Sequence, residues 1–517
     1  NKTETCYNSK SLMERFEKSV QEYPERIAVV SANGQVTYGE LNQRANAIGH
    51  KLQKMGIGRN DVVAVCIERS IEMVVAIYGI LKAGAAYLPI DKRIPSERMA
   101  YMCRNSESKA VIVLNEEDAE FFEEKVQMTI ILEKENLKGN FPDLQIKNED
   151  DDIAYVIYTS GTTGMPKGVM NRHVSLKNRI DWMDEKYPID MTDVILQKTI
   201  YSFDVSVWEI IWWGIKGAKL GLLDNGAEMD FSLMCDRIKQ YQITVMHFVP
   251  SVFEVFLEYI EENLSEKEEL VSLKRIFLSG EVLKVEHVEK FYHIFGKTGA
   301  KLINLYGPTE AAIDVTYYEC KEKQEIIPIG KPISNTKIHI EKDGKECGVG
   351  VPGEICIAGV GLAKGYINNK RLTEEKFVKN PYDGGKMYRS GDLARWLPDG
   401  NIEFLGRKDE QIKIRGIRIE LKEIENVISK IKGVRQVVLQ TKEKEKEKAI
   451  CAYIVGDEKL SMDSVRNTLR KKLPEYMIPT YMMQIEQVPL TLNGKVDRKN
   501  LPEIVIRSEG EYEEPKD

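Results

Sequence analysis

The segment Tyr158–Val169, which reads YTSGTTGMPKGV, constrains this chain more than any other stretch. It follows the apolar run Ile153–Tyr158, whose length and bounding turn residues predict a short buried strand. Glycines let the backbone approach a bulky anion, hydroxyl and amide groups donate hydrogen bonds, and Lys167 adds a positive charge. We therefore expect a phosphate-holding loop, although an exposed turn would also explain a stretch rich in glycine and threonine. Gly168 stands where a Walker loop has Ser or Thr, so the loop is of another type.

The first third of the chain alternates between helical and strand patterns. Helix-period apolar positions and short apolar runs follow one another at lengths that predict α/β layers with a largely parallel sheet. The expected helices cover residues 11–23, 38–53 and 71–83, and the expected strands or extended segments cover 27–30, 36–37, 62–67 and 84–91.

The pattern changes from Val349 onward, where short strands alternate with turns such as Pro352-Gly353 and Pro398-Asp399-Gly400. This spacing predicts a β-rich subdomain built from hairpins. We place the main domain boundary at Asp409, which divides the chain into a core of residues 1–408, a C-terminal domain of residues 409–505, and a linker or tail of residues 506–517. Within the C-terminal domain, the charged run 442–448 (KEKEKEK) predicts an exposed hairpin loop.

Composition excludes several classes of protein. The 517 residues are too many for one core, and 42% hydrophobic with 30% charged residues is typical of a soluble globular protein. A net charge of −7 without a basic block argues against nucleic acid as a partner. The eight cysteines form no CxxC pair, which favours reduced thiols in a cytoplasmic protein. We find no run long enough to span a membrane and no signal peptide.

Three further stretches place polar residues among apolar ones. Asp204 lies in the aromatic run YSFDVSVWE, His247 in the predicted strand YQITVMHFVP, and Ser279 at the end of LKRIFLSGE. The segment Leu302–Thr316 predicts a strand, a Gly-Pro turn and a helix start, and contains Glu310 and Asp314. Taken singly, such residues are usually helix caps, turn formers or hydrogen-bonded core residues.

Together, these segments resemble the adenylate-forming superfamily, which includes the amino-acid-activating adenylation domains of nonribosomal peptide synthetases, acyl-CoA synthetases and luciferases. The resemblance covers almost the whole chain and is nearest to the amino-acid-activating branch. It implies a large N-terminal domain of three subdomains and a small mobile α+β C-terminal domain. Besides the loop at 158–169, the matching motifs are LKAGAAYLPID (81–91), FDVSVWE (203–209), NLYGPTE (304–310), YRSGDLARW (388–396), GRKDEQIKIRG (406–416), LPEYMIP (473–479) and NGKVDRK (493–499).

The resemblance also implies how ATP is held. Glu310 would hold Mg²⁺, Thr309 would donate to the α-phosphate, and Lys495 would reach the carboxylate and α-phosphate as the catalytic cation. A hinge at Asp409 would move the small domain, withdrawing Lys495 and presenting the Gly416 turn for thioester formation. The other nucleotide contacts implied are Thr159, Ser160, Gly161, Thr162, Thr163, Gly164 and Lys167 for the phosphates, Asn304 and Tyr306 for the base, Asp392 with Arg407 for the ribose, and Phe404 as a further contact to ATP or AMP.

The family's amino-acid pocket corresponds here to ten residues. Asp204 would pair with the α-ammonium group, while three large side chains leave little room, and His247, Ser279 and Asp314 would be left unpaired without a substrate hydroxyl. This set resembles the serine-activating pattern, so we expect L-serine; L-threonine needs room for one more methyl group. The pocket residues are Asp204, Val205, Trp208, His247, Phe277, Ser279, Leu305, Ile313, Asp314 and Lys495.

The expected activity is formation of aminoacyl-AMP with release of pyrophosphate, then transfer to the phosphopantetheine thiol of a peptidyl carrier domain. A stand-alone ligase for L-threonine or D-alanine and an acyl-CoA synthetase-like enzyme are alternatives within the enzyme class. A nucleotide-binding scaffold is the alternative outside it, and the presence of Lys167, Glu310, Asp392 and Lys495 argues against it. The ending YEEPKD resembles a linker before a carrier domain, and the need for a small activator protein stays open.

Overall fold

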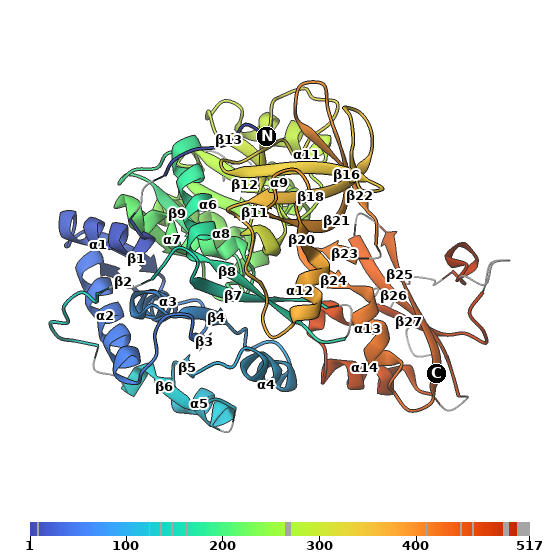
Figure 1. The fold of residues 1–517 in the computed structure, drawn as a ribbon, viewed down its shortest axis with the longest axis horizontal. Coiled ribbons are helices and arrows are strands. Elements are labelled where there is room, and N and C mark those ends of the chain that lie inside the picture. Colours follow the sequence, from blue (N-terminus) through green and yellow to red (C-terminus); the bar gives the residue numbers. More distant parts are fainter. Residues whose placement is uncertain are drawn as a thin grey trace, which may run out of the picture.

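The computed structural model of the chain describes residues 1–7, 10–123, 125–134, 137–145, 148–161, 164–263, 270–409, 411–444, 447–457, 460–489 and 496–503. Thr162, Thr163 and Lys495, which the sequence places in the site, lie outside these residues. The predicted α/β class, with a large N-terminal part and a smaller C-terminal part, is confirmed by the arrangement of sheets and helices (Figure 1).

The largest sheet has nine strands, and its central strands are parallel. The strands β13, β14 and β15 at one edge and β1 and β2 at the other are paired antiparallel. In spatial order, the strands are β15 (Lys331–Pro332), β14 (Thr316–Glu319), β13 (Lys301–Tyr306), β12 (Arg275–Leu278), β11 (Val245–Phe248), β9 (Val194–Gln197), β10 (Lys219–Leu222), β1 (Ile27–Ser31) and β2 (Gly34–Thr37).

A second sheet of seven strands carries the glycine-rich loop. Its strands β4, β3, β5 and β6 run parallel, β7 runs parallel to β4, and β8 turns back antiparallel to β7. In spatial order, the strands are β19 (Gly365–Tyr366), β8 (Lys167–Arg172), β7 (Ile153–Thr159), β4 (Ala86–Pro89), β3 (Val62–Cys66), β5 (Ala110–Val113) and β6 (Met128–Ile131).

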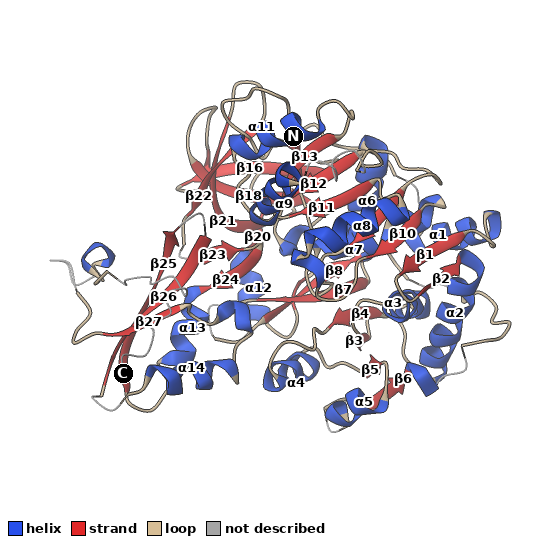
Figure 2. Ribbon diagram, turned by 180° about the vertical axis from the view of Figure 1, so that it is seen from behind, coloured by secondary structure: helices blue, strands red, loops and turns tan. Residues whose placement is uncertain are grey.

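Helices separate and cover these two sheets (Figure 2). One buried cluster joins residues of both sheets to α2, α3, α6 and α7, a second packs α8, α9 and α11 on the nine-stranded sheet, and a third includes α4 and α5. The helices of this part are α1 (Leu12–Glu22), α2 (Tyr38–Lys54), α3 (Ile71–Ala83), α4 (Ser96–Asn105), α5 (Glu116–Phe122), α6 (His173–Lys186), α7 (Val205–Ile211), α8 (Phe231–Tyr241), α9 (Pro250–Glu262), α11 (Val285–Phe295) and α12 (Lys370–Lys376).

Helix α3 shows how the sequence sets this layering. The Ser70 hydroxyl accepts a hydrogen bond from the Met73 N–H at the start of the helix, and Gly84, at φ 91°, ends it in the left-handed conformation that favours glycine. Nearly every side chain between these caps is buried. A helix that is apolar on all faces requires apolar partners on all faces, and α3 contacts β3 and β4 of one sheet and β1 of the other.

The predicted β-rich part is present and begins earlier than Val349, because β16 already belongs to it. Its six-stranded sheet is antiparallel. The strands are β16 (Thr336–Lys342), β17 (Lys345–Glu346), β18 (Gly353–Gly359), β20 (Phe377–Lys379), β21 (Lys386–Trp396) and β22 (Ile402–Arg407).

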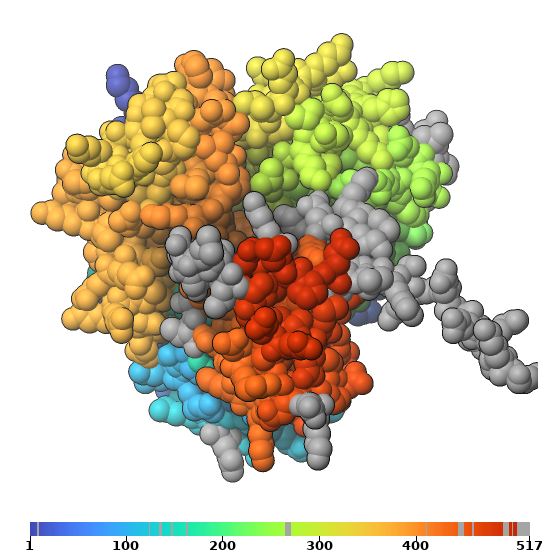
Figure 3. Space-filling view, turned by 90° about the vertical axis from the view of Figure 1, so that its right-hand side faces the viewer, coloured from blue at the N-terminus to red at the C-terminus, as the bar shows by residue number. Residues whose placement is uncertain are grey.

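The C-terminal elements have a buried cluster of their own and lie beside the rest of the chain (Figure 1). Figure 3 shows their orange and red residues filling the middle of one face, between yellow and green residues above and light-blue residues below. Of the charged run at 442–448, which was predicted to be an exposed hairpin loop, residues 442–444 and 447–448 belong to the paired strands of a long hairpin, and residues 445–446 lie outside the described part of the chain. The elements are β23 (Gln411–Ile414), β24 (Ile417–Glu420), α13 (Leu421–Ile428), β25 (Val434–Lys444), β26 (Glu447–Gly456), α14 (Met462–Arg470) and β27 (Tyr481–Gln484).

All eight cysteines are free thiols, and six of them are buried, as the sequence predicted. In the described residues, no helix is long and apolar enough to cross a membrane.

Candidate active site

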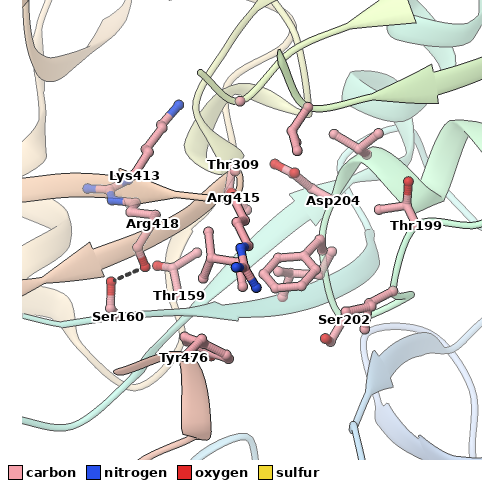
Figure 4. Close-up of a pocket in the computed structure, with 18 of the residues that line it drawn as sticks. Thr159, Ser160, Thr199, Ser202, Asp204, Thr309, Lys413, Arg415, Arg418 and Tyr476 are labelled. Carbon is pink, nitrogen blue, oxygen red and sulfur yellow. Dashed lines mark hydrogen bonds between the residues drawn. The ribbon is translucent and has the colours of Figure 1, made fainter. Parts of the chain in front are cut away.

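A cavity of about 470 Å³ lies where the two large sheets, the β-rich part and the C-terminal hairpin β23–β24 come together (Figure 4). The cavity is lined by His247, near the end of β11, and by the segments that follow β7, β12 and β13. These are the carboxyl ends of strands, the usual place for ligands in open α/β sheets. Figure 4 shows Asp204 on one side and Lys413, Arg415 and Arg418 of the hairpin on the other.

The glycine-rich segment joins β7 to β8, whose register pairs Thr159 with Lys167. A Cβ on Gly161 would collide with the Met165 carbonyl oxygen, so this tight turn requires glycine. The C-terminal part already engages the turn. The Ser160 hydroxyl donates to the Arg418 carbonyl at 2.8 Å, and the Gly161 N–H donates to the Glu423 carboxylate at 2.9 Å.

Glu423 thus places an anion at the backbone amide of the predicted phosphate loop. Its second oxygen accepts from the Arg98 guanidinium at 2.5 Å, and its side chain is fully buried. A carboxylate at this amide occupies one of the donors that a phosphate group would use.

Glu310 is the centre of a buried cluster of charges. Its carboxylate accepts from Lys167 Nζ at 3.1 Å, from the Tyr366 hydroxyl at 2.7 Å, and from Arg418 Nη1 at 3.1 and 3.2 Å. Burial alone would raise the pKa of Glu310, but Arg418 and Lys167 hold that pKa well below its usual value. Burial, with Arg418 nearby, lowers the pKa of Lys167 to about 8. In this arrangement both cations neutralise the Glu310 carboxylate.

The described residues contain no group of three or more His, Cys, Asp or Glu side chains that could hold a metal. A single carboxylate such as Glu310 still fits Mg²⁺, because this ion commonly takes one or two carboxylates and completes its shell with phosphate oxygens and water.

Tyr306, Asp392 and Arg407 form a hydrogen-bonded chain at another corner. The Tyr306 hydroxyl donates to Asp392 Oδ2 at 2.5 Å, and Arg407 Nη1 donates to Asp392 Oδ1 at 2.5 Å. Arg407 also holds Asp409, the predicted hinge residue, through two bonds of 2.7 and 2.8 Å. Arg407 therefore links the predicted ribose carboxylate directly to the predicted hinge.

The structure divides the predicted nucleotide residues into two groups. Thr159, Ser160, Thr309, Asp392 and Arg407 line the cavity. The remaining described ones are not among the residues that line it: Gly161, Gly164, Lys167, Asn304, Tyr306, Phe404 and Glu310.

Two of the residues predicted to contact the nucleotide, Asn304 and Phe404, are already engaged with the protein. The Asn304 amide donates to the Pro328 carbonyl at 2.9 Å, and the Phe404 ring lies 6.1 Å from the Tyr306 ring between centroids.

Six predicted amino-acid pocket residues line the cavity, namely Asp204, Val205, His247, Ser279, Ile313 and Asp314. The three large ones, Trp208, Phe277 and Leu305, pack behind this wall in one buried cluster, with the Trp208 and Phe277 rings 5.6 Å apart. Burial raises the pKa of Asp204 to about 6, although hydrogen bonding from the Thr309 side chain acts to lower it. A bound ammonium group would stabilise the ionised form of this carboxylate.

The expectation that His247, Ser279 and Asp314 lack partners in the absence of a substrate is wrong. His247 Nε2 and Ser279 Oγ are 2.9 Å apart, and burial, with Lys198 nearby, lowers the pKa of His247 well below its usual value. Arg179 of α6 donates to Asp314 at 2.8 Å. The polar side chains of the pocket satisfy one another because the interior does not tolerate unpaired polar groups.

The predicted helix start after the Gly-Pro turn is also wrong. A single 3-10 turn, η4 (Thr309–Ala311), is followed by Ala312 and Ile313 at φ 56° and 81°, and the chain then enters β14. A positive φ is rare for a β-branched residue such as Ile313. This turn interrupts helical continuation and places Ile313 and Asp314 in the cavity wall.

The β23–β24 turn reaches the cavity as well. The Gly416 N–H donates to Glu281 at 2.8 Å, and a Cβ on Gly416 would collide with the Val249 side chain. The sequence analysis did not identify six residues that line the cavity or secure the hairpin: Arg98, Lys413, Arg415, Arg418, Glu423 and Tyr476. The only signal in the sequence was that Lys413 and Arg415 lie within the matching motif IKIRG and Tyr476 lies within LPEYMIP.

The fold places a cavity lined by predicted nucleotide and amino-acid residues between a large α/β part and a small C-terminal part. Comparison with known families agrees. Residues 16–367 match the family described as AMP-binding enzyme, and residues 423–495 match the AMP-binding enzyme C-terminal domain. The chain belongs to this family and is an adenylate-forming ligase of the kind found in nonribosomal peptide synthetases.

The chain is similar to parts of large synthetases and also to a protein of similar length. The chain is 47% identical over 503 residues to a component of the mycosubtilin synthase of Bacillus subtilis, covering 95% of this chain but 19% of that protein. It is 41% identical to bacitracin synthase 1 of Bacillus licheniformis, of which it covers 10%. It is 42% identical to zwittermicin A synthase ZmaJ of Bacillus cereus over 95% of both chains.

Solved structures show the same fold. PA1221, a nonribosomal peptide synthetase protein containing adenylation and PCP domains, superposes with a TM-score of 0.81 at 25% identity, covering 95% of this chain and 83% of that one. The fused adenylation–PCP di-domain NpsA-ThdA from Klebsiella oxytoca superposes with a TM-score of 0.79 at 25% identity, covering 93% and 94%.

Proposed function

We propose that this chain activates L-serine as seryl-AMP and passes the seryl group to the phosphopantetheine thiol of a peptidyl carrier domain. In the first step the serine carboxylate attacks the α-phosphorus of ATP, and pyrophosphate leaves. In the second step the thiol sulfur attacks the seryl carbonyl carbon, and AMP leaves. The observation that carries the proposal is that the polar residues Asp204, His247, Ser279 and Asp314 all line the same cavity.

Asp204 selects for an α-amino acid. Its carboxyl group is buried in the wall and has a raised pKa, so an ammonium group placed beside it gains a charge-assisted hydrogen bond while the carboxylate regains its ionised form. An aryl or fatty acid offers no such group, which disfavours the acyl-CoA synthetase alternative.

The side-chain end of the pocket suits a small hydroxyl group. Trp208, Phe277 and Leu305 fill the space behind the wall and limit the size of a substrate side chain. Asp314 accepts one bond from Arg179 and also faces the cavity, where a carboxylate can accept another bond from a hydroxyl. L-alanine lacks this donor, and the extra methyl group of L-threonine is discriminated by only about 1–3 kcal/mol.

ATP would be held by the segment at Thr159–Gly164 with Lys167, by Thr309, and by Asp392 with Arg407 at the ribose. Glu310 would hold Mg²⁺, which stabilises negative charge on the phosphate oxygens during attack. Because the Glu310 carboxylate is bonded to Arg418 in the present arrangement, Mg²⁺ binding requires Arg418 to withdraw.

Each of the two half-reactions therefore uses a different arrangement of the C-terminal part. In the present one, the Gly416 turn lies in the cavity wall, which suits thiol entry and thioester formation. Rotation about Asp409 would remove Arg418 and Glu423 and bring Lys495 to the carboxylate and α-phosphate for adenylation. The joined adenylation and PCP domains of PA1221 and NpsA-ThdA support a carrier domain as the thiol donor.

The test is ATP–pyrophosphate exchange with the twenty L-amino acids, D-serine, D-alanine and simple carboxylic acids. Exchange that peaks with L-serine is the expected result, and Asp204→Asn should remove it while ATP binding persists. A peak with another amino acid would support the proposed adenylation reaction but refute the assignment of the pocket to L-serine. No exchange with any acid by the folded protein would refute the proposed reaction for the chain alone and lead to a search for an activator protein. Transfer is then measured with a phosphopantetheinylated carrier domain added as a separate protein.

A further inference from the structure

Arg179 lies behind the amino-acid pocket without forming part of its wall. It belongs to α6, and its Nη2 atom donates to Asp314 Oδ2 at 2.8 Å. Only 1% of the Arg179 side chain and 2% of the Asp314 side chain are exposed. Asp314 does line the cavity, so Arg179 touches the pocket through this carboxylate.

A carboxyl group as buried as Asp314 depends on a cation to stay charged. Burial raises the pKa of Asp314, and the Arg179 guanidinium opposes that rise. The other charged or titratable groups that face this pair are Asp204 before α7, Lys413 on β23, Tyr155 on β7, Tyr187 after α6 and His247 on β11. Within the part of the chain that the structure describes, Arg179 is the cation paired directly with Asp314.

The bonding of Arg179 is unlike that of a structural buried arginine. Arg69, whose side chain is 6% exposed, donates to five acceptors in the last residue of β9, the segments after β9 and β10, and the following 3-10 turn. In Arg179 the Nε and Nη1 groups are buried without a hydrogen-bond partner, and the guanidinium lies over the Trp182 ring at 4.9 Å. Leaving such donors unpaired is costly, and the contact that offsets this cost is the one to Asp314.

We propose that Arg179 is a positioning residue for substrate selection, which keeps Asp314 ionised and directs one of its oxygens to accept a hydrogen bond from the substrate side-chain hydroxyl. This inference rests on the proposed function and adds a determinant outside the pocket wall. An ionised carboxylate can only accept hydrogen bonds, so it favours a hydroxyl donor over a methyl group. A protonated Asp314 carboxyl would donate as well as accept and would lose part of this preference.

The preference is measured as the ratio of kcat/KM for L-serine to that for L-alanine in pyrophosphate exchange, from pH 6 to pH 9. We expect Arg179→Met to lower this ratio about tenfold or more at neutral pH, the value of one charge-assisted hydrogen bond. In that variant the ratio should rise with pH as Asp314 ionises, whereas in the wild type it should stay constant. Protonation of Asp204 affects both amino acids alike and cancels in the ratio.

Two further variants separate positioning from folding. Arg179→Lys should restore part of the ratio, because it returns a cation without the fork geometry. The double variant Arg179→Met, Asp314→Asn contains no unpaired buried charge, and its ratio should be low at every pH and no lower than that of Asp314→Asn alone. Lys177→Met is the matched control. Lys177 lies on the same helix, its Nζ atom is 2.6 Å from Asp150 Oδ1, and neither residue lines the cavity. Melting temperature and ATP affinity report folding.

An unchanged ratio in folded Arg179→Met overturns the inference, as does an equal fall in Lys177→Met. If Arg179→Met does not fold, the double variant decides, and a ratio there below that of Asp314→Asn alone overturns the inference, because Arg179 would then act other than through Asp314. A wild-type chain that shows no preference for L-serine refutes the proposed function and this inference with it. A serine preference that survives the loss of Arg179 refutes the inference alone.

Discussion

Replacing Glu423 with glutamine removes the negative charge that the C-terminal part places at the Gly161 amide of the phosphate loop. The Glu423 carboxylate is fully buried and accepts bonds from the Gly161 N–H at 2.9 Å and from Arg98 at 2.5 Å. A glutamine of the same shape keeps one acceptor oxygen but points its NH₂ group at a donor. The loss of a hydrogen bond to a charged group is worth about 1.5–3 kcal/mol, which shifts the equilibrium away from this arrangement roughly tenfold to a hundredfold.

The two half-reactions should respond in opposite directions. Because Glu423 and Arg418 occupy groups that we assign to the phosphates and Mg²⁺, ATP binds only after they leave, and its apparent affinity is reduced by the fraction of molecules in the competent state. If the present arrangement dominates without ligand, Glu423→Gln should therefore bind ATP·Mg²⁺ more tightly, by up to roughly tenfold to a hundredfold. Transfer of the seryl group from preformed seryl-AMP to the carrier should become slower.

Calorimetry measures the ATP affinity, and rapid quench with labelled serine measures transfer. Lys422→Gln is the matched control, because Lys422 is the exposed neighbour of Glu423 on α13. Unchanged ATP affinity together with unchanged transfer would refute the reasoning, since the buried contacts would then contribute nothing to the balance between arrangements. Equal loss of both activities with a lower melting temperature would indicate unfolding and would also contradict it.

Three other changes test the site. Burial raises the pKa of Asp204 to about 6, so below pH 6 its carboxyl group takes up a proton and no longer pairs with the substrate ammonium group. The KM for the amino acid in pyrophosphate exchange should therefore rise as the pH falls below 6. A KM that stays constant between pH 5 and 8 would contradict this. Lys495→Ala should reduce adenylation by a factor of about a hundred or more while ATP binding persists, and unchanged turnover would remove Lys495 from its proposed role. Arg418→Met should slow transfer to the carrier and leave pyrophosphate exchange intact, because it frees Glu310; loss of exchange would instead assign Arg418 to adenylation.

Much of the fold could be predicted from the sequence because its signals are local. The apolar helix Ile71–Ala83 has the predicted bounds, and its capping serine and terminal glycine lie next to it in the chain. The buried strand before the glycine-rich loop was predicted from a few neighbouring residues. The turn after Tyr306 was mistaken for a helix start, because the left-handed conformations of Ala312 and Ile313 have no local signal in residues that rarely adopt them.

The sequence by itself determined the class of enzyme, through motifs whose order and spacing cover almost the whole chain. It also predicted ten residues of an amino-acid pocket, six of which line the cavity. Only the tertiary structure decided how the charges pair. Arg179 meets Asp314 across 135 positions, Arg418 meets Glu310 across 108, and Glu423 meets Gly161 across 262. No local pattern specifies such pairs, because buried charges find their counter-ions only when separate layers of the fold pack together.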